Sequence, residues 1–301
     1  MTDYHVPVML EECLEGLNIK PNGVYVDTTY GGGGHAKAIL NKLDDKGVLM
    51  VFDQDSDAVK NRIDDPRLIF CEANFRYLEN FCTYYRIEKI DGLLADLGVS
   101  SHQFNEGDRG FSFRFEGSEL DMRMNAEAKI SAKDILNNYD QYKLTSLFRQ
   151  YGELKNAPSV ARAVCEYRKL RPIEKVEDLE DAVTSVLNPR QKNKQLAQIY
   201  QAVRIEVNGE MEALKDLLNQ VPAWIAQGGR LVVMSYHSLE DRLVKNLINH
   251  GNVEGKKEVD SFGQWNQCFK AVNRKPIVAS EEELAKNNRA RSAKLRIAER
   301  V

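Results

Sequence analysis

The sequence lacks three features that would each fix a protein class. No apolar run among its 301 residues approaches the roughly 18 residues of a membrane helix, so we expect no membrane partner. Residues 1–12 carry acids and no basic stretch ahead of an apolar one, so we expect no secretory signal there. Basic side chains are not in excess, because the formal net charge is −3. Nucleic acid would therefore be met only through a local basic patch.

Cysteine is scarce and scattered. The five residues are Cys13, Cys71, Cys82, Cys165 and Cys268, and no two of them form a Cys-x-x-Cys pair. This spacing argues against a disulfide framework and against a zinc cluster. We therefore expect reduced thiols, no bound metal and a cytoplasmic protein.

Short apolar runs that alternate with helical stretches indicate the fold class. With 43% hydrophobic and 29% charged residues, the composition is that of a globular protein with a real core. Strands are expected at residues 23–27, 47–53, 68–71, 90–96 and 230–235, and helices at 36–43, 57–63 and 239–249. Strands that are apolar on both faces and alternate with helices predict an α/β protein with a parallel, doubly wound sheet.

A helical stretch interrupts this pattern between about residues 107 and 205. Helices are expected at 132–138, 143–151, 159–169, 176–187 and 194–207. An amphipathic helix follows around residues 211–221, and we expect the Gly228-Gly229 pair to end it. The predicted organisation is a discontinuous α/β domain, residues 1–110 and 206–301, with an inserted all-helical domain at 111–205.

The strongest local motif is Asp27-Thr28-Thr29-Tyr30-Gly31-Gly32-Gly33-Gly34-His35-Ala36, between the first strand and the first helix. Such glycines let the backbone approach a ligand closely. Gly31-x-Gly33-x-x-Ala36 fits the dinucleotide fingerprint, and Asp53 stands where a ribose-binding acid is expected. No Gly-Lys-Ser/Thr follows, which excludes a P-loop. Two cofactor classes remain: a nicotinamide dinucleotide and S-adenosylmethionine.

Asp27 favours the second cofactor class. An acid ahead of the glycine loop suits a cationic amino-acid moiety and would repel a pyrophosphate. There is also no Pro-Cys dipeptide and no Asn/Asp-Pro-Pro-aromatic motif. Their absence disfavours cysteine-dependent methylation of a ring carbon and an ordinary DNA amino-methyltransferase, so we expect no DNA partner.

Two further segments lie at strand ends, where open α/β sheets bind ligands. Asp96, Ser100 and Gln103 follow the fourth strand. His237 follows the fifth strand and is a candidate base. Next to it, Ser238 fits a helix N-cap with Asp241 three residues later, which we expect to be a structural role.

Basic side chains concentrate in two places. Residues 149–175 carry seven of them against three acids, and the C-terminal segment adds Arg289, Arg291, Lys294, Arg296 and Arg300. Such patches can neutralise phosphates, although a solvated helix face has the same composition. We expect the first patch to face RNA, with charge reversal at Arg168 and Lys169 weakening RNA binding.

Taken together, the motifs make the chain resemble the RsmH (MraW) family of bacterial ribosomal RNA methyltransferases. The resemblance runs from end to end and rests on blocks such as Asp27-x-Thr29-x-Gly31-x-Gly33-Gly34-His35, Asp53-x-Asp55, Asp96-Leu97-Gly98-Val99-Ser100-Ser101-x-Gln103, Arg109-Gly110-Phe111-Ser112-Phe113, Leu120-Asp121-Met122-Arg123-Met124 and His237-Ser238-Leu239-Glu240-Asp241-Arg242. The chain departs from the family's usual residues at Tyr30, Ala36 and Asn288.

The resemblance implies a class I, Rossmann-like methyltransferase that uses S-adenosylmethionine. The implied target is the exocyclic N4 of a cytidine in 16S rRNA of the small ribosomal subunit, position 1402 in the usual numbering. The implied cofactor contacts are Gly33, Gly34, His35, Asp53, Phe75, Asp96 and Gln103. For the residue that accepts the N4 proton, Asp96, Ser100 and His237 remain alternatives.

Two rival functions are weighed against this one. A nicotinamide oxidoreductase is disfavoured by Asp27 and by the resemblance along the whole chain. A non-catalytic ribosome-assembly factor with the same pocket would bind the cofactor without turnover. The sequence leaves open whether the protein is a monomer or a homodimer, and whether it acts on free RNA or on an assembled subunit.

Overall fold

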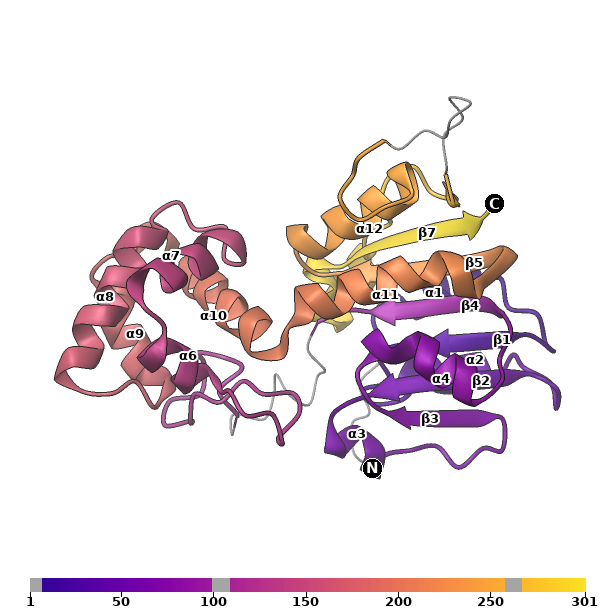
Figure 1. Cartoon of the computed structure of the whole chain (residues 1–301), viewed down its shortest axis with the longest axis horizontal. Helices are drawn as coiled ribbons and strands as arrows, with labels where there is room; N and C mark the ends of the chain where they lie inside the picture. The colour runs from indigo at the N-terminus through magenta and orange to yellow at the C-terminus, as the bar shows by residue number, and fades with distance from the viewer. Residues whose placement is uncertain (1–6, 99–108, 258–266) are drawn as a thin grey trace. The chain divides into compact units, whose positions relative to one another are not determined.

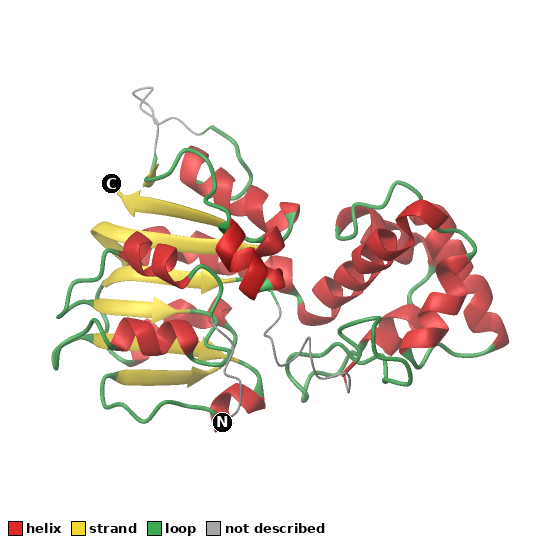
Figure 2. Cartoon of the chain, turned by 180° about the vertical axis from the view of Figure 1, so that it is seen from behind, coloured by secondary structure: helices red, strands yellow, loops and turns green. Residues whose placement is uncertain are grey.

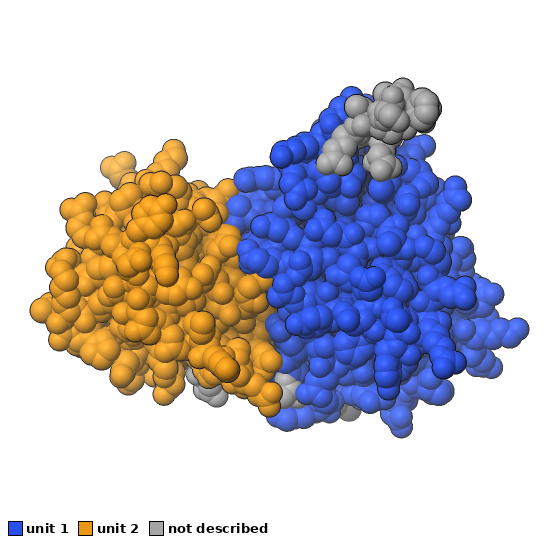
Figure 3. Space-filling view, in the orientation of Figure 1, with its two compact units in different colours: residues 1–98, 211–301 blue, residues 99–210 orange. Residues whose placement is uncertain are grey.

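The computed structural model describes residues 7–98, 109–257 and 267–301. The chain forms two compact units (Figure 3). The sheet unit consists of Met1–Gly98 and Met211–Val301, and the helical unit of Val99–Glu210. The helical unit is thus inserted between two segments of the sheet unit. Over the described ranges, no helix is both long enough and apolar enough to cross a membrane.

The described part of the sheet unit contains one seven-stranded sheet with the order β3-β2-β1-β4-β5-β7-β6 (Figure 1). The strands are β1 (Val24–Asp27), β2 (Val48–Asp53), β3 (Leu68–Glu72), β4 (Ile90–Asp96), β5 (Ile225–Ser235), β6 (Phe269–Ala271) and β7 (Lys294–Arg300). Strands β1 to β5 are parallel, whereas β7 is antiparallel to both of its neighbours. The carboxyl ends of β1, β2, β4 and β5 therefore meet at one edge, where open α/β sheets bind ligands.

Helices cover both faces of this sheet (Figure 2). On β5, Leu231 and Val233 join the core formed with α4 (Leu78–Tyr84), α11 (Glu210–Trp224) and α12 (Ser238–His250). Val232 and Met234 join the core formed with α1 (Leu10–Leu17) and α2 (Gly34–Leu40). Because successive side chains of a strand point to opposite faces, burial of both faces requires uninterrupted apolar runs. The described residues of the unit also form α3 (Ser56–Lys60), η1 (Phe75–Tyr77), α13 (Glu281–Lys286) and η4 (Asn288–Ser292).

The predicted fold class and all five predicted strands are confirmed. One boundary is wrong: α11 already ends at Trp224, and the Gly228-Gly229 pair lies within β5. Strand β7 was missed because Lys294, Arg296, Glu299 and Arg300 made this segment look like a basic surface. In the structure, only its apolar side chains enter the cores of the unit, with the charged ones between them.

The helical unit confirms the five helices expected in the insert, with ends shifted by at most three residues. They are α6 (Ala132–Asn138), α7 (Gln141–Gln150), α8 (Ala157–Leu170), α9 (Val176–Thr184) and α10 (Lys192–Asn208), and a short 3-10 helix η3 (Pro189–Gln191) precedes α10. They bury a core of their own, which includes Phe148, Val164 and Ile199. A separate core is the property of an independently packed domain.

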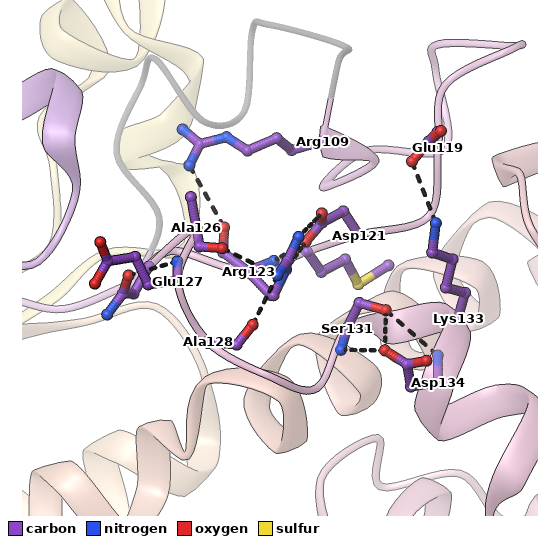
Figure 4. A network of polar contacts seen from close by, with 12 residues as sticks. Arg109, Glu119, Asp121, Arg123, Ala126, Glu127, Ala128, Ser131, Lys133 and Asp134 are labelled. Carbon is purple, nitrogen blue, oxygen red and sulfur yellow. Dashed lines mark hydrogen bonds and ion pairs between the residues drawn. The ribbon is translucent and has the colours of Figure 1, made fainter.

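A polar network fixes the segment that leads into α6 (Figure 4). Arg123 donates from Nε and Nη2 to the two carboxylate oxygens of Asp121, both at 2.7 Å. Its Nη1 donates to the backbone carbonyls of Ala126 and Ala128, at 3.0 and 2.7 Å. Asn208 of α10 then joins this segment to the helices, because its side chain accepts from the Met124 amide.

The planar guanidinium group of Arg123 is therefore needed to hold this segment in its conformation. We expect Arg123→Lys to lower the free energy of unfolding of the helical unit by about 1–3 kcal/mol, since an ammonium cannot reproduce the bidentate pair and both carbonyl bonds. Thermal unfolding of the full chain measures the effect, with the exposed Arg149→Lys as the matched control. Equal melting temperatures for the two variants would contradict the role assigned to the network.

Candidate active site at the carboxyl edge of the sheet

The glycine loop connects β1 to α2. Gly31 and Gly33 have φ of 52° and 76°, in the left-handed region that favours glycine. A Cβ at Gly33 would also lie 2.8 Å from the hydroxyl oxygen of Tyr30. Gly33 is the N-cap of α2 and provides no side chain to cap its amides. The glycines thus leave the backbone amides uncovered by side chains at the position where the motif predicts a ligand.

Asp53 ends β2 and is bound to this loop. Its Oδ2 accepts from the Gly31 amide at 2.8 Å, and its Oδ1 accepts from the Asp55 amide at 2.9 Å. Burial raises the pKa of Asp53, and these backbone bonds oppose the rise. The acid predicted to bind a ribose therefore also holds the glycine loop in place, a contact that sequence spacing alone could not show.

Asp27 ends β1 and is fully buried. Its Oδ1 accepts from the backbone amide of Thr29 at 3.0 Å and from the Thr29 hydroxyl at 3.4 Å. Its Oδ2 is buried and has no hydrogen-bond partner among the described residues. Burial raises the pKa of Asp27 to about 6, against the opposing effect of the nearby His35.

An orphaned carboxylate oxygen is costly unless a donor or a cation meets it. A cationic amino-acid moiety supplies both, so the residues present fit S-adenosylmethionine. The same oxygen would face an anion unfavourably, which disfavours the pyrophosphate of a dinucleotide.

His35 lies in the first turn of α2 and is buried. Its Nε2 is 3.2 Å from the carbonyl oxygen of Val8, and its Nδ1 is 3.8 Å from Oδ2 of Asp96. Burial lowers the pKa of His35, so the neutral ring is favoured near pH 7. The histidine of the glycine motif thus connects the loop to the end of β4.

Asp96 is the last residue of β4 and stands next to the glycine loop. Its backbone amide donates to the Thr29 hydroxyl at 2.8 Å, and its Oδ1 accepts from the Tyr236 hydroxyl at 2.6 Å. Burial raises the pKa of Asp96 to about 7, although the Tyr236 bond opposes the rise. A carboxyl group with a pKa near neutrality can both accept and release a proton under ordinary conditions.

His237 follows β5 and has a structural partner. It is the N-cap of α12: its Nδ1 accepts from the Glu240 backbone amide at 3.4 Å, and its Nε2 lies 3.1 Å from Oε1 of Glu240. The predicted N-cap at Ser238 is therefore wrong by one residue, because Ser238 is already the first residue of α12. Asp241, three residues after Ser238, pairs with Arg296 at 2.7 Å.

Not every predicted site residue can be placed. Ser100 and Gln103 lie outside the described residues. Phe75 begins η1 just after β3 and is partly buried against the core of the sheet. Tyr236 was not singled out from the sequence, because an aromatic residue after a buried strand normally reads as core. Its only signal was its place between β5 and the candidate base His237.

This sheet order, the glycine loop after β1 and the acid at the end of β2 define a class I, Rossmann-like methyltransferase. The family model described as "MraW methylase family" matches residues 2–301. The chain belongs to this family, which confirms the resemblance found in the sequence, and its methyl donor is S-adenosylmethionine.

Curated relatives cover almost the whole chain. Ribosomal RNA small subunit methyltransferase H of Phocaeicola vulgatus is 52% identical over 297 residues, 99% of this chain and 97% of the relative. The protein of the same name from Parabacteroides distasonis is 53% identical over 299 residues, 99% of this chain and 98% of the relative. A third, from Christiangramia forsetii, is 52% identical over 301 residues, 100% of this chain and 99% of the relative.

Proposed function

We propose that the protein transfers the methyl group of S-adenosylmethionine to the exocyclic N4 of one cytidine in 16S rRNA, at position 1402 in the usual numbering. The names of the curated relatives support small-subunit ribosomal RNA as the substrate. The structural observation that carries the proposal is Asp96, a partly buried carboxyl group at the end of β4 that contacts the glycine loop through the Thr29 hydroxyl and whose pKa burial raises to about 7. An amino nitrogen must lose a proton to become a methylated amine, and Asp96 is suited to take it.

The reaction then needs no covalent enzyme intermediate. S-adenosylmethionine supplies the methyl group: its carbon–sulfur bond breaks, the electron pair stays on sulfur, and the nitrogen–carbon bond forms. The lone pair of N4 is delocalised into the ring, so an acceptor at the amino hydrogens localises it as the bond forms. Asp96 receives that proton, and most of the remaining rate enhancement comes from positioning.

Of the two candidate acceptors that the structure describes, Asp96 and His237, the geometry favours Asp96; Ser100 lies outside the described residues. Nδ1 of His237 is used to cap α12, because it accepts from the Glu240 backbone amide, and its Nε2 lies 3.1 Å from Oε1 of Glu240 without a hydrogen bond. Asp96 is instead next to the glycine loop, through the Thr29 hydroxyl. The residues proposed to hold the cofactor are Gly33, Gly34, His35, Asp53, Phe75, Asp96 and Gln103, with Asp27 facing its cationic amino-acid moiety.

We place the RNA-facing surface on the helical unit, at the exposed side chains of Arg149, Lys155 and Arg162. Within the part of the chain that the structure describes, none of the three forms an ion pair. Arg168 and Lys169 are less suitable, because Arg168 donates to the Leu136 carbonyl at 2.7 Å and Lys169 pairs with Glu166. The three free cations lie on or beside α7 and α8, which pack against each other.

The C-terminal basic patch expected from the sequence offers less positive charge to RNA than its composition suggested. Arg296 is paired with Asp241, and Arg300 donates to the backbone carbonyls of Pro222 and Cys268. These guanidinium groups bind β7 to neighbouring segments of the sheet unit. We therefore do not include Arg296 and Arg300 in the proposed RNA surface.

Charge reversal tests this surface. The double variant Lys155→Glu and Arg162→Glu is expected to weaken binding of small ribosomal subunits and to lower the dependence of log K on log salt by about 2, because two phosphate contacts are lost. Cofactor affinity should not change. The control is Lys42→Glu with Lys46→Glu, an equal charge change on exposed residues before β2. An equal loss of binding in both double variants would reject the assignment.

Methyl transfer from labelled S-adenosylmethionine tests the function itself. The two substrates are small subunits that lack the modification and the naked RNA extracted from them. Label on the RNA of either supports a methyltransferase, and the faster of the two identifies the form that the enzyme recognises. Cofactor binding without label on either would support the assembly-factor alternative and overturn the proposal.

A further inference from the structure

Tyr236 connects the ends of two neighbouring strands. It directly follows β5, and its hydroxyl group donates to Oδ1 of Asp96, the last residue of β4, at 2.6 Å. Its own backbone amide donates to Oε2 of Glu240 at 2.8 Å. Glu240 is only 4% exposed and belongs to the first turn of α12. The tyrosine is thus fixed at its backbone by α12 and at its hydroxyl group by Asp96.

The ring of Tyr236 is confined as well. It packs against the core that includes α1 and α2. Gly98 lies beside it with φ of 104°, and a Cβ there would come within 3.3 Å of the ring. A glycine at this position therefore permits the close approach that lets the hydroxyl group reach Asp96.

We propose that Tyr236 is a positioning residue for methyl transfer: it occupies Oδ1 of Asp96 and so leaves Oδ2 as the oxygen that takes the proton from the amino group. This inference rests on the proposed function, because that function gives the ionised Asp96 its role. Tyr236 itself touches no reacting atom in this account. A short hydrogen bond to a carboxylate both selects its rotamer and stabilises its charged form.

Several groups from different elements influence the charge of Asp96. Tyr236 and Arg289 favour the carboxylate, and the negative charges of Glu240 and Asp27 oppose it. His35 lies with its Nδ1 3.8 Å from Oδ2, and Cys13 stays a neutral thiol because burial raises its pKa well above the usual range. Removal of the Tyr236 hydroxyl leaves the others in place. The pKa of Asp96 must then rise, because a donor to the charged form is lost.

The test compares Tyr236→Phe, which keeps the ring, with Tyr25→Phe. Tyr25 is a matched control, because its buried hydroxyl accepts from the Lys20 amide at 2.7 Å, near the amino end of β1. Three quantities are measured in each protein: the pH profile of kcat, the affinity for S-adenosylmethionine by calorimetry, and the titration of the Asp96 carboxyl carbon by ¹³C NMR.

For Tyr236→Phe we expect the acidic limb of the pH profile of kcat to move up by about one pH unit and kcat at pH 7 to fall about fivefold, because the ionised fraction of Asp96 drops from about one half to about one tenth. The carboxyl titration of Asp96 should move in the same direction, and cofactor affinity should stay within about threefold. Tyr25→Phe should leave all three unchanged. An Asp96 titration and an acidic limb that both match the wild type would overturn the inference.

The NMR titration separates this inference from the proposed function. If the wild type makes no methylated cytidine, the proposed function fails. The titration of Asp96 in Tyr236→Phe still decides whether the tyrosine controls that carboxyl group, because it needs neither RNA nor turnover.

Discussion

Asp96→Asn is expected to lower kcat by about 10²- to 10⁴-fold, the usual contribution of a positioned general base. The amide has the shape of the carboxylate and can still accept from the Tyr236 hydroxyl, so folding should be preserved. It cannot take a proton from the amino group. Initial rates with labelled S-adenosylmethionine measure the loss, and calorimetry should show a change of less than about tenfold in cofactor affinity.

The pH dependence of the methyl-transfer rate tests the role of Asp96 in a second way. Because the pKa of Asp96 is about 7, the wild-type rate should fall as the pH drops through 7 and the carboxylate takes up a proton. The residual rate of Asp96→Asn should lack this limb. Asp65→Asn is the control, since Asp65 belongs to a local ion pair with Arg67. Full activity of Asp96→Asn would rule out Asp96 as the acceptor.

Asp27→Asn is expected to weaken binding of S-adenosylmethionine by about 30-fold or more, because a buried carboxylate loses its charge beside the cationic moiety. S-adenosylhomocysteine should lose a similar factor, since it has the same ammonium group and lacks only the sulfonium charge. Calorimetry with both ligands measures the two factors. The control is Asp91→Asn, whose carboxylate pairs with Lys20 instead.

The same substitution should stabilise the protein without ligand. The pKa of Asp27 is raised from 3.8 to about 6 in the folded state, so its protonated form favours folding at low pH. That stabilisation is complete below pH 4 and is lost as the pH rises through 6, a difference of about 3 kcal/mol. At pH 7.5 we expect Asp27→Asn to gain about 1–2 kcal/mol, because its amide NH₂ remains unpaired.

Thermal unfolding at two pH values checks this trade-off. The gain in melting temperature should be present at pH 7.5 and should vanish near pH 4. A variant that binds the cofactor normally, or that is less stable than the wild type at pH 7.5, would contradict the assignment of Asp27 as the partner of a cation.

The sequence was sufficient for features that depend on local patterns. Apolar runs located β1 to β5, and the helical period located the five helices of the insert. The glycine loop and Asp53 were found because their spacing along the chain is itself a signal. Where a segment is both charged and extended, as in β7, local pattern was misleading: Arg296 and Arg300 form part of the sheet unit rather than a free basic surface.

The contacts between distant segments could not be predicted. Asp96 and Tyr236 are 140 residues apart, and only the parallel pairing of β4 with β5 brings them together. The N-cap of α12 was misplaced by one residue because serine has the stronger general preference. In the structure, the imidazole of His237 performs that function, since Glu240 completes the capping box from N3.

The identity of the methylated nucleoside tests the central claim most directly. Small subunits that lack the modification are incubated with the enzyme and labelled S-adenosylmethionine, and the RNA is then digested to nucleosides and analysed by mass spectrometry. We predict one product, N4-methylcytidine, at a single site, formed about 10²- to 10⁴-fold more slowly by Asp96→Asn. A methyl group on a ring carbon, on a ribose hydroxyl or on a different base would contradict it.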